Sequence, residues 1–450
     1  MSSMKARQGP DATIGVVGAG YVGLITAAAL ALLGHRVICA DINDDRVRAL
    51  RAGQVPFFEP GLAGLLAEHR DRITFTTAPA TVFDKAGIVF VTVDTPPLPS
   101  GEADLSRVES VVDAIPPGVG PLTLVMKSTV PVGTGANVRQ VLDQRGLFRV
   151  RYVANPEFLR EGSAVQDVTH PDRVIVGCDD PADAAVVAAL WAPFGGESMT
   201  CDVASAEMIK LASNAFLATK ISFVNEIANV CERVGADVEV VARGMGHDHR
   251  IGASFLRAGI GYGGSCFPKD VLALMQLAGN SGYRFRLLAA VIEVNELQRR
   301  RVVATLREQL GDLRGRRIAL LGLAFKPGTD DMREATSVVL AEALAAGGAT
   351  LVVHDPAVPP SALGLLPAGT VWARGTTEAI SGADAAVIVT EWPQYRALLA
   401  PGTSAAMARP LLVDGRNLLT RAEAEDAGYQ WLGVGQPAAR SGEPALVRAG

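Results

Sequence analysis

The sequence predicts an α/β protein in which two doubly wound domains are joined by a long central helix. Apolar, β-branched runs alternate with helical patterns in both halves of the chain, which is typical of parallel sheets. The two halves also share a pattern. In each half an expected strand runs directly into a glycine, at 17–18 and at 321–322, and the following strand ends in an aspartate, Asp41 or Asp355. Residues 204–234 contain no glycine or proline and are apolar almost all round. We therefore expect two Rossmann-like domains and one long helix, buried between domains or subunits.

The expected strands follow from short apolar runs that end in polar or glycine-rich segments. In the first half they lie at 13–17, 35–41, 87–93, 122–126, 150–155 and 172–177, and in the second half within 316–326, 350–356, 382–392 and 410–417. We expect a first Rossmann-like domain at 1–203, a central region at 204–312, a second Rossmann-like domain at 313–436 and a disordered tail at 437–450.

Bulk composition indicates a packed protein of two or three domains, because 49% of the 450 residues are apolar and only 20% are charged. Lys and Arg total 42 against 47 Asp and Glu, so the net charge of −5 gives no support to a nucleic-acid or membrane partner. Five cysteines without a CxxC pair argue against a disulfide framework or structural zinc. With a polar first dozen residues and no long apolar run, we expect a cytoplasmic protein.

Gly18, Gly20 and Gly23 form a GxGxxG pattern between an expected strand and helix. The first glycine allows a tight turn, the second lets a pyrophosphate approach the backbone, and the third lets helix and strand pack closely. Asp41 ends the next strand, where its carboxylate would accept a hydrogen bond from a ribose 2′-hydroxyl and would repel a 2′-phosphate. The pattern predicts dinucleotide binding and favours NAD over NADP, although Arg46 lies nearby; the alternative is a structural glycine turn.

Two further pairs of polar residues have the spacing of one helix turn. In "NPEFLREG" (155–162), Asn155 and Pro156 are typical of a helix start, so Glu157 and Glu161 would share a face. Solvated first-turn acids are the simpler explanation. Lys210 and Asn214 lie on the long apolar helix, where a lysine must pair, lose its proton or extend to solvent.

"GIGYGGSCFPKD" (259–270) presents Cys266 on glycine-rich backbone rather than inside an apolar element. Pro268 suits the first turn of a helix, so Cys266 is expected just before a helix N-terminus, where the helix dipole and Lys269 favour the thiolate. We expect the glycines to give access to the sulfur, and Asp270 to orient or deprotonate a water. The other four cysteines are expected in the core. His247 and His249 have no third ligand nearby in sequence, so no metal site is expected.

Taken together, these segments resemble the UDP-glucose/GDP-mannose dehydrogenase family from about residue 13 to residue 419. The resemblance is carried by "GAGYVG", "KSTVPVGT", "NPEFLREG", "EMIKLASNAFLATKISFVNE", "GIGYGGSCFPKD", "GLAFKPGTDDMRE" and "DGRN". It implies that NAD oxidises the C6 alcohol of a nucleotide sugar to an aldehyde. Cys266 then captures the aldehyde, a second NAD oxidises the thiohemiacetal, and the thioester is hydrolysed to the acid. An aldehyde cannot donate a hydride until a nucleophile has made its carbon tetrahedral.

The same resemblance assigns the remaining residues. The catalytic group would be Cys266, Lys210, Asn214, Asp270, Glu161, Thr129 and Glu157. NAD would be bound by Gly18, Gly20, Tyr21, Val22, Gly23, Asp41, Arg46, Thr95, Thr129, Glu161, Lys269 and Arg333. The sugar nucleotide would be bound by Glu157, Phe158, Leu159, Lys210, Asn214, Arg250, Phe255, Arg257, Gly263, Lys326 and Arg416. The family contributes a residue matching Arg250 from a neighbouring subunit, so a homodimer through the long helix is expected.

UDP-glucose oxidised to UDP-glucuronate is the leading interpretation. GDP-mannose and UDP-N-acetylhexosamines are rival substrates within the family. A non-catalytic nucleotide-binding regulator is an alternative from another class, against which the intact set of Cys266, Lys210 and Asp270 argues. A two-electron dehydrogenase would need neither Cys266 nor a second nucleotide-binding domain. One departure from the family pattern stands out, because Asp94 in "VTVDTPP" occupies a position where relatives often carry Pro, Gly or Asn.

Overall fold

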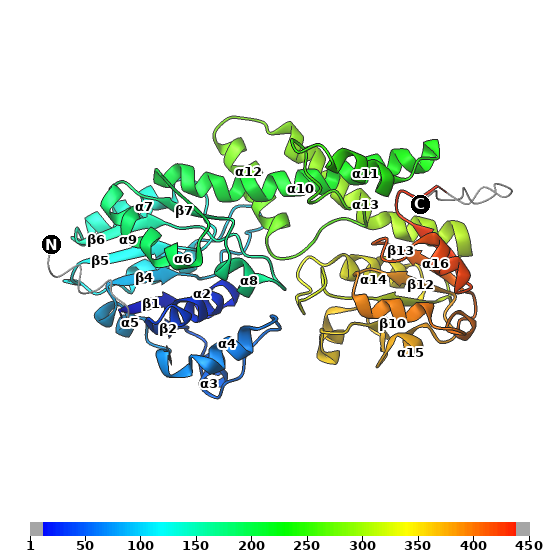
Figure 1. Cartoon of the computed structure of the whole chain (residues 1–450), viewed down its shortest axis with the longest axis horizontal. Helices are drawn as coiled ribbons and strands as arrows, with labels where there is room; N and C mark the ends of the chain where they lie inside the picture. Colours follow the sequence, from blue (N-terminus) through cyan, green and yellow to red (C-terminus); the bar gives the residue numbers. More distant parts are fainter. Residues whose placement is uncertain (1–11, 438–450) are drawn as a thin grey trace. The chain divides into compact units, whose positions relative to one another are not determined.

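The computed structural model describes residues 12–437, which form two compact units (Figure 1). Unit 1 contains the chain up to residue 215 together with residues 269–285, and unit 2 contains residues 216–268 together with the chain from 286 onward. The polar first dozen residues and the expected disordered tail at 437–450 lie almost wholly outside the described part, which leaves out residues 1–11 and 438–450. The domain boundaries expected from the sequence remain predictions.

Unit 1 is built on an eight-stranded sheet with the order β3-β2-β1-β4-β5-β6-β7-β8. Its strands are β1 (Thr13–Val17), β2 (Arg36–Ala40), β3 (Ile73–Thr76), β4 (Ile88–Val91), β5 (Leu122–Met126), β6 (Val150–Ala154), β7 (Arg173–Gly177) and β8 (Glu197–Cys201). All neighbours are parallel except β6 and β7. The expected parallel, doubly wound sheet is confirmed apart from this one antiparallel step. Between β6 and β7 the chain forms one helix, α8 (Ala164–Thr169), which has six residues. This helix is too short to carry the chain back across the sheet, as a parallel neighbour would require.

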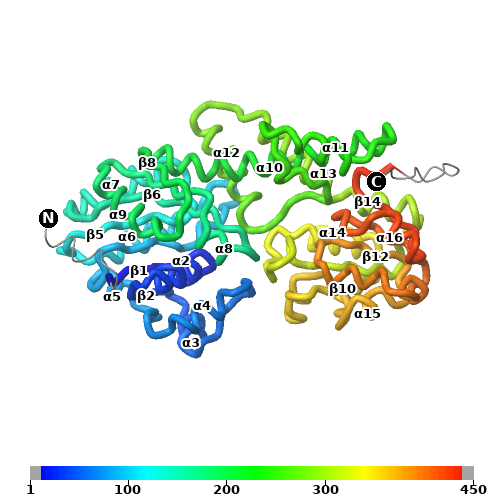
Figure 2. Tube along the Cα trace, in the orientation of Figure 1, coloured from blue at the N-terminus to red at the C-terminus, as the bar shows by residue number. Residues whose placement is uncertain are grey.

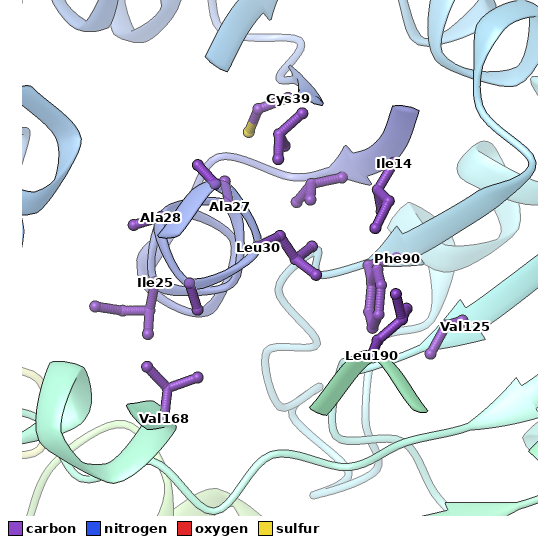
Figure 3. Close-up of a cluster of buried hydrophobic side chains, with 14 of the residues drawn as sticks. Ile14, Ile25, Ala27, Ala28, Leu30, Cys39, Phe90, Val125, Val168 and Leu190 are labelled. Atoms are coloured by element: carbon purple, nitrogen blue, oxygen red, sulfur yellow. The ribbon is translucent and has the colours of Figure 1, made fainter. Parts of the chain in front are cut away.

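Helices cover this sheet and supply its core. They are α2 (Tyr21–Leu32), α3 (Asp44–Arg51), α4 (Leu62–Glu68), α5 (Pro79–Lys85), α6 (Ser106–Asp113), α7 (Thr134–Gln144), α8 and α9 (Pro181–Trp191), with short 3-10 helices η1 (Arg70–Arg72) and η2 (Ala192–Phe194). The Ala- and Leu-rich α2 is buried along most of its length. Figure 3 shows its Ile25 and Leu30 in one cluster with Ile14 of β1 and Phe90 of β4. This packing holds α2 against β1 and β4.

Unit 2 repeats the arrangement with a fully parallel six-stranded sheet in the order β11-β10-β9-β12-β13-β14. Its strands are β9 (Arg317–Leu321), β10 (Thr350–His354), β11 (Val371–Trp372), β12 (Ala385–Ile388), β13 (Leu411–Asp414) and β14 (Gln430–Gly433). Its helices are α11 (Val238–Gly246), α13 (Arg286–Leu310), α14 (Thr336–Ala346), α15 (Thr376–Ile380) and α16 (Arg421–Asp426), with η3 (Pro360–Leu365), η4 (Pro393–Leu399) and η5 (Ser404–Ala406). The strand order reverses between β9 and β12 as it does between β1 and β4, which confirms two Rossmann-like sheets. Figure 2 traces the chain through β10, β12 and β14 of the second unit.

Two helices belong to both units. The long helix α10 (Val203–Val234) has 32 residues, as its lack of glycine and proline predicts. It is not buried all round within the single chain, because Phe216, Phe223 and Val230 are exposed. These residues are seven apart and lie on one side of the helix. The second such helix is α12 (Phe267–Asn280). Within residues 12–437 no helix is long and apolar enough to cross a membrane.

Candidate active site

The turn after β1 uses its three glycines for different purposes. Gly18 has a φ of +105°, and a Cβ there would lie 2.7 Å from the carbonyl oxygen of Thr92. A Cβ on Gly23 would lie 1.8 Å from the carbonyl oxygen of Gly18. Gly20 differs, because the nearest atom to a Cβ there is the Asp94 Oδ1 at 3.8 Å. The fold itself requires the first and third glycines, whereas the second leaves open the space that a pyrophosphate needs.

Asp41 follows β2 and is buried beside this turn. Its carboxylate accepts hydrogen bonds from the backbone N–H of Ala19 at 2.8 Å and of Asn43 at 2.9 Å. Its third partner is the Arg46 guanidinium at 2.9 Å, and that side chain is about one-third exposed. Arg46 can therefore move aside while the two backbone bonds stay, which leaves an anionic acceptor for ribose hydroxyls. The residues present fit a dinucleotide whose ribose carries no 2′-phosphate.

The sequence analysis missed Glu59, a buried carboxylate beside the same turn. It accepts the hydroxyl hydrogen of Tyr21, the first residue of α2, and the backbone N–H groups of Gly162 at 2.6 Å and Ala164 at 2.8 Å. Burial and the Glu59 carboxylate raise the pKa of Tyr21 far above its ordinary value, so this phenol stays protonated. Glu59 thus fixes the peptide directly after Glu161, which is half-buried. Only tertiary contacts reveal this role.

Val22, the next predicted cofactor residue, accepts a hydrogen bond from the Thr26 hydroxyl through its backbone oxygen at 2.7 Å.

Lys210 and Glu157 form a buried ion pair, with Nζ and Oε1 2.8 Å apart. Burial alone would raise the pKa of Glu157, but the Lys210 ammonium and the Leu159 N–H outweigh burial and lower it below its ordinary value. The Leu159 N–H donates to Glu157 Oε2 at 2.6 Å. Of the two sequence interpretations, solvated acids are therefore wrong for Glu157. Lys210 also lies 5.4 Å from the centre of the Phe158 ring.

The expected helix start at Asn155 and Pro156 is wrong, because residues 155–160 form no regular structure and α8 begins only at Ala164. The Asn155 side chain makes tertiary bonds instead of capping a helix. Its Nδ2 donates to the Ile175 carbonyl oxygen at 2.8 Å, and its Oδ1 accepts from Trp191 Nε1 and Lys127 Nζ, both at 3.1 Å. Glu157 and Glu161 therefore do not share a helix face.

Lys127 is a second buried lysine near this pair, and its sequence context gave no sign of it. Its ammonium lies 4.7 Å from the centre of the Trp191 ring and donates to Asn155. Burial, with the neighbouring Lys210 adding to it and Glu157 opposing it, lowers the pKa of Lys127 to about 8. The site thus gathers two lysines and one glutamate away from water.

Two predicted threonines lie next to these charges. The hydroxyl of Thr95 donates to the Thr129 carbonyl oxygen at 2.7 Å. Thr129, Ser128, Pro156 and Lys210 line one small pocket. The "KSTVPVGT" segment therefore leads from the end of β5 to the ion pair.

Asn214, one turn after Lys210 on α10, donates to Asp270 Oδ2 at 2.6 Å. Asp270 is buried in the first turn of α12 and also forms an ion pair with Lys269, at 2.6 Å from Oδ1 to Nζ. Cys266 is half-buried and directly precedes α12, which confirms its expected place before a helix N-terminus. The helix after the thiol is thus fixed through Asp270 to the helix that carries Lys210.

Within unit 2, buried polar side chains hold the loop that leads to Cys266. Asn225 accepts the Gly259 N–H at 2.9 Å and Gln298 donates to the Gly259 oxygen at 2.9 Å. Asn295 bonds both the N–H and the oxygen of Tyr262, at 2.8 and 3.1 Å. A Cβ on Gly263 would lie 2.1 Å from the Glu334 oxygen. The expectation that these glycines give access is therefore wrong: they are buried and permit close backbone packing.

The remaining predicted residues of unit 2 are mostly basic. Arg416 is largely buried, and it donates to the oxygens of Val389 and Gly261, both at 2.8 Å. Burial lowers the pKa of Arg416 from its ordinary value. Arg257 donates to the Asn417 oxygen at 3.1 Å, and Phe255 adopts a left-handed φ of +64°. The other three take these positions: Lys326 lies 5.4 Å from the centre of the Phe325 ring, Arg333 pairs with Asp331 at 2.6 Å, and Arg250 pairs with Asp248 at 2.6 Å on an exposed loop.

The other cysteines and histidines show no sign of a second site. Cys39, Cys178 and Cys231 are buried, as expected for core residues, whereas Cys201 is half-buried. Burial raises the pKa of the Cys39 thiol well above its ordinary value. The side chain of His249 is almost fully exposed, and the described residues contain no group of three or more potential ligands that could hold a metal ion.

Three family models match the chain in order. They are the UDP-glucose/GDP-mannose dehydrogenase family NAD binding domain at residues 12–195, its central domain at 204–297 and its UDP binding domain at 319–421. The chain belongs to the UDP-glucose/GDP-mannose dehydrogenase family. It is an NAD-dependent oxidoreductase, and the NAD binding domain of this family contains the glycine turn, Asp41 and Glu59. The match bears out the resemblance seen in the sequence motifs.

Similar proteins cover nearly the whole chain. UDP-glucose 6-dehydrogenase TuaD of Bacillus subtilis is 43% identical over 436 residues, which are 96% of this chain and 95% of that protein. UDP-glucose 6-dehydrogenase of Pseudomonas aeruginosa is 45% identical over 441 residues, which are 94% and 97% of the two chains. The solved structure of a UDP-glucose dehydrogenase from Pyrobaculum islandicum has a TM-score of 0.88 and 37% identity, covering 95% of this chain and 98% of that chain.

Proposed function

We propose that this dehydrogenase oxidises UDP-glucose to UDP-glucuronate with two molecules of NAD. Relatives that are 43–45% identical over most of the chain are UDP-glucose 6-dehydrogenases. Every chemical group that the two-step oxidation requires is present in this sequence. NAD accepts the hydride of each step when it is bound, and the side chains of the protein supply the nucleophile, the charge stabilisation and the proton transfers.

The observation that carries the proposal is the network at the first turn of α12. Lys210 and Asn214 lie one turn apart on α10, Asn214 is bonded to Asp270, and Cys266 stands immediately before the helix that contains Asp270. A thiol, a buried cation and a buried carboxylate are the three groups needed to capture an aldehyde, stabilise its oxyanion and hydrolyse a thioester. A structural helix start would need none of these groups.

Each residue then has one role. Lys210, with Asn214, stabilises negative charge on the C6 oxygen, while Glu157 keeps the lysine positioned and takes part in proton transfer. The Cys266 thiolate adds to the aldehyde carbon, and the resulting oxyanion takes up a proton to give the thiohemiacetal. Loss of the second hydride and of that proton leaves a thioester. Water activated by Asp270 then adds to the thioester carbonyl, the carbon–sulfur bond breaks, and the acid and the Cys266 thiol are released. Glu161 and Thr129 position groups at C6.

The remaining predicted residues bind the two nucleotides. We propose that the glycine turn, Tyr21, Val22, Asp41, Arg46, Thr95, Lys269 and Arg333 hold NAD. We propose that Phe158, Leu159, Arg250, Phe255, Arg257, Gly263, Lys326 and Arg416 hold the sugar nucleotide. Basic side chains among them suit the diphosphate of the substrate.

We also propose a homodimer that forms through α10. Phe216, Phe223 and Val230 make an exposed apolar stripe on this helix, and the side chain of Arg250 is exposed where it could reach a partner. A cytoplasmic location is proposed because none of the five cysteines forms a disulfide, as is usual in reducing compartments.

The test is to incubate the protein with limiting UDP-glucose and excess NAD, and to count NADH per sugar consumed. We expect about two NADH per UDP-glucose, because the carbon is oxidised twice at one site. A ratio near one contradicts the thioester route, and no NADH with any nucleotide sugar indicates a non-catalytic regulator. Preferential oxidation of GDP-mannose or of a UDP-N-acetylhexosamine moves the assignment to another member of the family. The Cys266→Ala variant must lose formation of the acid.

A further inference from the structure

Asp94 and Arg107 form an ion pair at the point where the strand order of the first sheet reverses. β1 and β4 are neighbours, with Ile14 paired to Ile88, so residues after β4 lie next to the glycine turn. The crevice outside such a reversal is where doubly wound sheets bind their ligands. Asp94 is the second residue after Thr92, which contacts Gly18, and its Oδ1 is the nearest atom to a Cβ placed on Gly20. The pair therefore borders the space left open by Gly20.

The charges at this position need an explanation. A carboxylate close to a bound pyrophosphate would repel the phosphate charges. The Asp94 carboxylate, however, accepts a hydrogen bond from Arg107 Nη1 at 3.0 Å, and the guanidinium neutralises its charge. Both side chains are more than half exposed, so their positions are not imposed by packing. Among the described residues Arg107 makes no other hydrogen bond, and a guanidinium has five N–H donors. Most of its donors are thus available to an anionic ligand.

Other charged groups near the turn are already engaged. Asp41 is paired with Arg46 after the neighbouring strand, and Glu59 is bonded to Tyr21 and to two backbone N–H groups. Arg107, by contrast, reaches the opening at Gly20 through its ion pair with Asp94 and has donors to spare.

We propose that Arg107 binds the pyrophosphate of the NAD cofactor and that Asp94 holds the guanidinium beside Gly20 before the cofactor enters. On binding, the phosphate oxygens replace part of the exposed ion pair with charge-assisted hydrogen bonds in a shielded crevice, where such bonds are stronger. The proposal rests on NAD as the cofactor of the proposed function, and it does not depend on which sugar is oxidised.

The test measures NADH affinity by fluorescence titration of the full chain without any nucleotide sugar. Arg107→Ala is expected to weaken NADH binding about tenfold, the loss of one charge-assisted phosphate contact, and Arg107→Lys is expected to restore part of it. Adenosine diphosphate ribose should lose affinity in parallel, whereas adenosine, which has no phosphate, should not. Arg48→Ala, which removes another exposed ion-paired arginine, serves as the control and should leave NADH binding within twofold. Unchanged affinity for NADH in Arg107→Ala overturns the proposal.

A double variant separates phosphate binding from simple neutralisation of Asp94. If Arg107 only neutralises Asp94, then Asp94→Asn combined with Arg107→Ala will bind NADH as tightly as Asp94→Asn alone, and the proposal fails. If Arg107 contacts the phosphates, the double variant stays about tenfold weaker than Asp94→Asn. A failure here, with wild-type protein that binds NADH and oxidises UDP-glucose, leaves the proposed function intact. A wild-type protein that does not bind NADH contradicts both.

Discussion

The two Rossmann-like sheets place an aspartate at the same topological position, but they use it differently. Asp41 after β2 has two backbone partners and one partly exposed side-chain partner, Arg46. Asp355 after β10 accepts five hydrogen bonds from fixed groups, namely the backbone N–H groups of Leu323, Ala324, Ala357 and Val358 and the indole N–H of Trp392. Asp41 can exchange a partner for a ribose hydroxyl, whereas Asp355 has no acceptor capacity to spare.

The turns before these aspartates differ in the same direction. Counting from Gly18 and Gly322, the residue that corresponds to Gly20 is Ala324, which is buried and whose carbonyl oxygen accepts the Thr390 hydroxyl at 2.5 Å. The second turn is thus closed where the first is open. One fold can therefore keep the geometry of a dinucleotide site while fixed internal partners occupy the positions that a dinucleotide would take.

The largest expected effect separates the glycines of the first turn. Gly23→Ala should lower the free energy of unfolding by at least about 3 kcal/mol, because its Cβ would overlap the Gly18 oxygen. Gly20→Ala should change stability by less than about 1 kcal/mol, because its Cβ meets no atom closer than 3.8 Å, yet it should weaken NADH binding at least about tenfold. Urea unfolding and NADH titration measure both. Equal effects of the two variants on stability would contradict the assigned roles.

The aspartates should separate in the same two assays. Asp355→Asn places an amide N–H₂ against fixed donors and should cost about 2–4 kcal/mol of stability with no change in NADH affinity. Asp41 has fewer fixed partners than Asp355, so Asp41→Asn should lower the free energy of unfolding by only about 1–2 kcal/mol. The lost charge should also weaken NADH binding about tenfold. If Asp355→Asn weakened NADH binding in a fully folded protein, the second sheet would have a cofactor role that the comparison denies.

A smaller effect should appear in the pH dependence of stability, because the first sheet buries the ammonium of Lys127 directly after β5. The pKa of Lys127 falls from 10.5 to about 8 on folding, so between these pH values the unfolded chain binds more protons than the folded one. The penalty for burying this charge is full below pH 8 and declines as the pH rises. The stability of the wild type relative to Lys127→Met should therefore increase by about 2 kcal/mol from pH 7 to pH 9.5.

Urea unfolding of both proteins at the two pH values measures this difference. Lys85→Met is a matched control, because Lys85 is exposed in the last turn of α5 and its removal should give no such pH dependence. A constant difference between wild type and Lys127→Met would show that Lys127 keeps its ordinary proton affinity in the folded protein.

Local pattern predicted the framework of the fold well. Strands β1, β2, β4 and the full length of α10 follow from β-branched runs, glycine turns and the absence of helix breakers. A strand was predicted at 172–177, but the reversed direction of β7 was not, because strand direction depends on the length of the connection before it. The helix expected at Asn155 does not form, because the Asn155 side chain bonds Lys127, Trp191 and Ile175 instead of capping a helix.

The site was predicted only in part for a similar reason. The place of Cys266 before a helix follows from sequence context, and Lys210 and Glu157 were expected in the site from the resemblance, but their ion pair was not predicted. Glu59 and Lys127 could not, because their roles arise from contacts with residues between 28 and 105 positions away. Nothing in the local sequence of a lysine before "STVP" indicates that it lies against a tryptophan.

The central claim is that the sulfur of Cys266 holds the substrate carbon between two oxidations. Its most direct test uses the Asp270→Asn variant, in which hydrolysis of the thioester should be slowed while its formation continues. After mixing with UDP-glucose and NAD and quenching in acid, mass spectrometry should find the UDP-glucuronyl group attached to the peptide that contains Cys266. Formation of UDP-glucuronate by the wild type, with no adduct on Cys266 in either protein, would contradict the account.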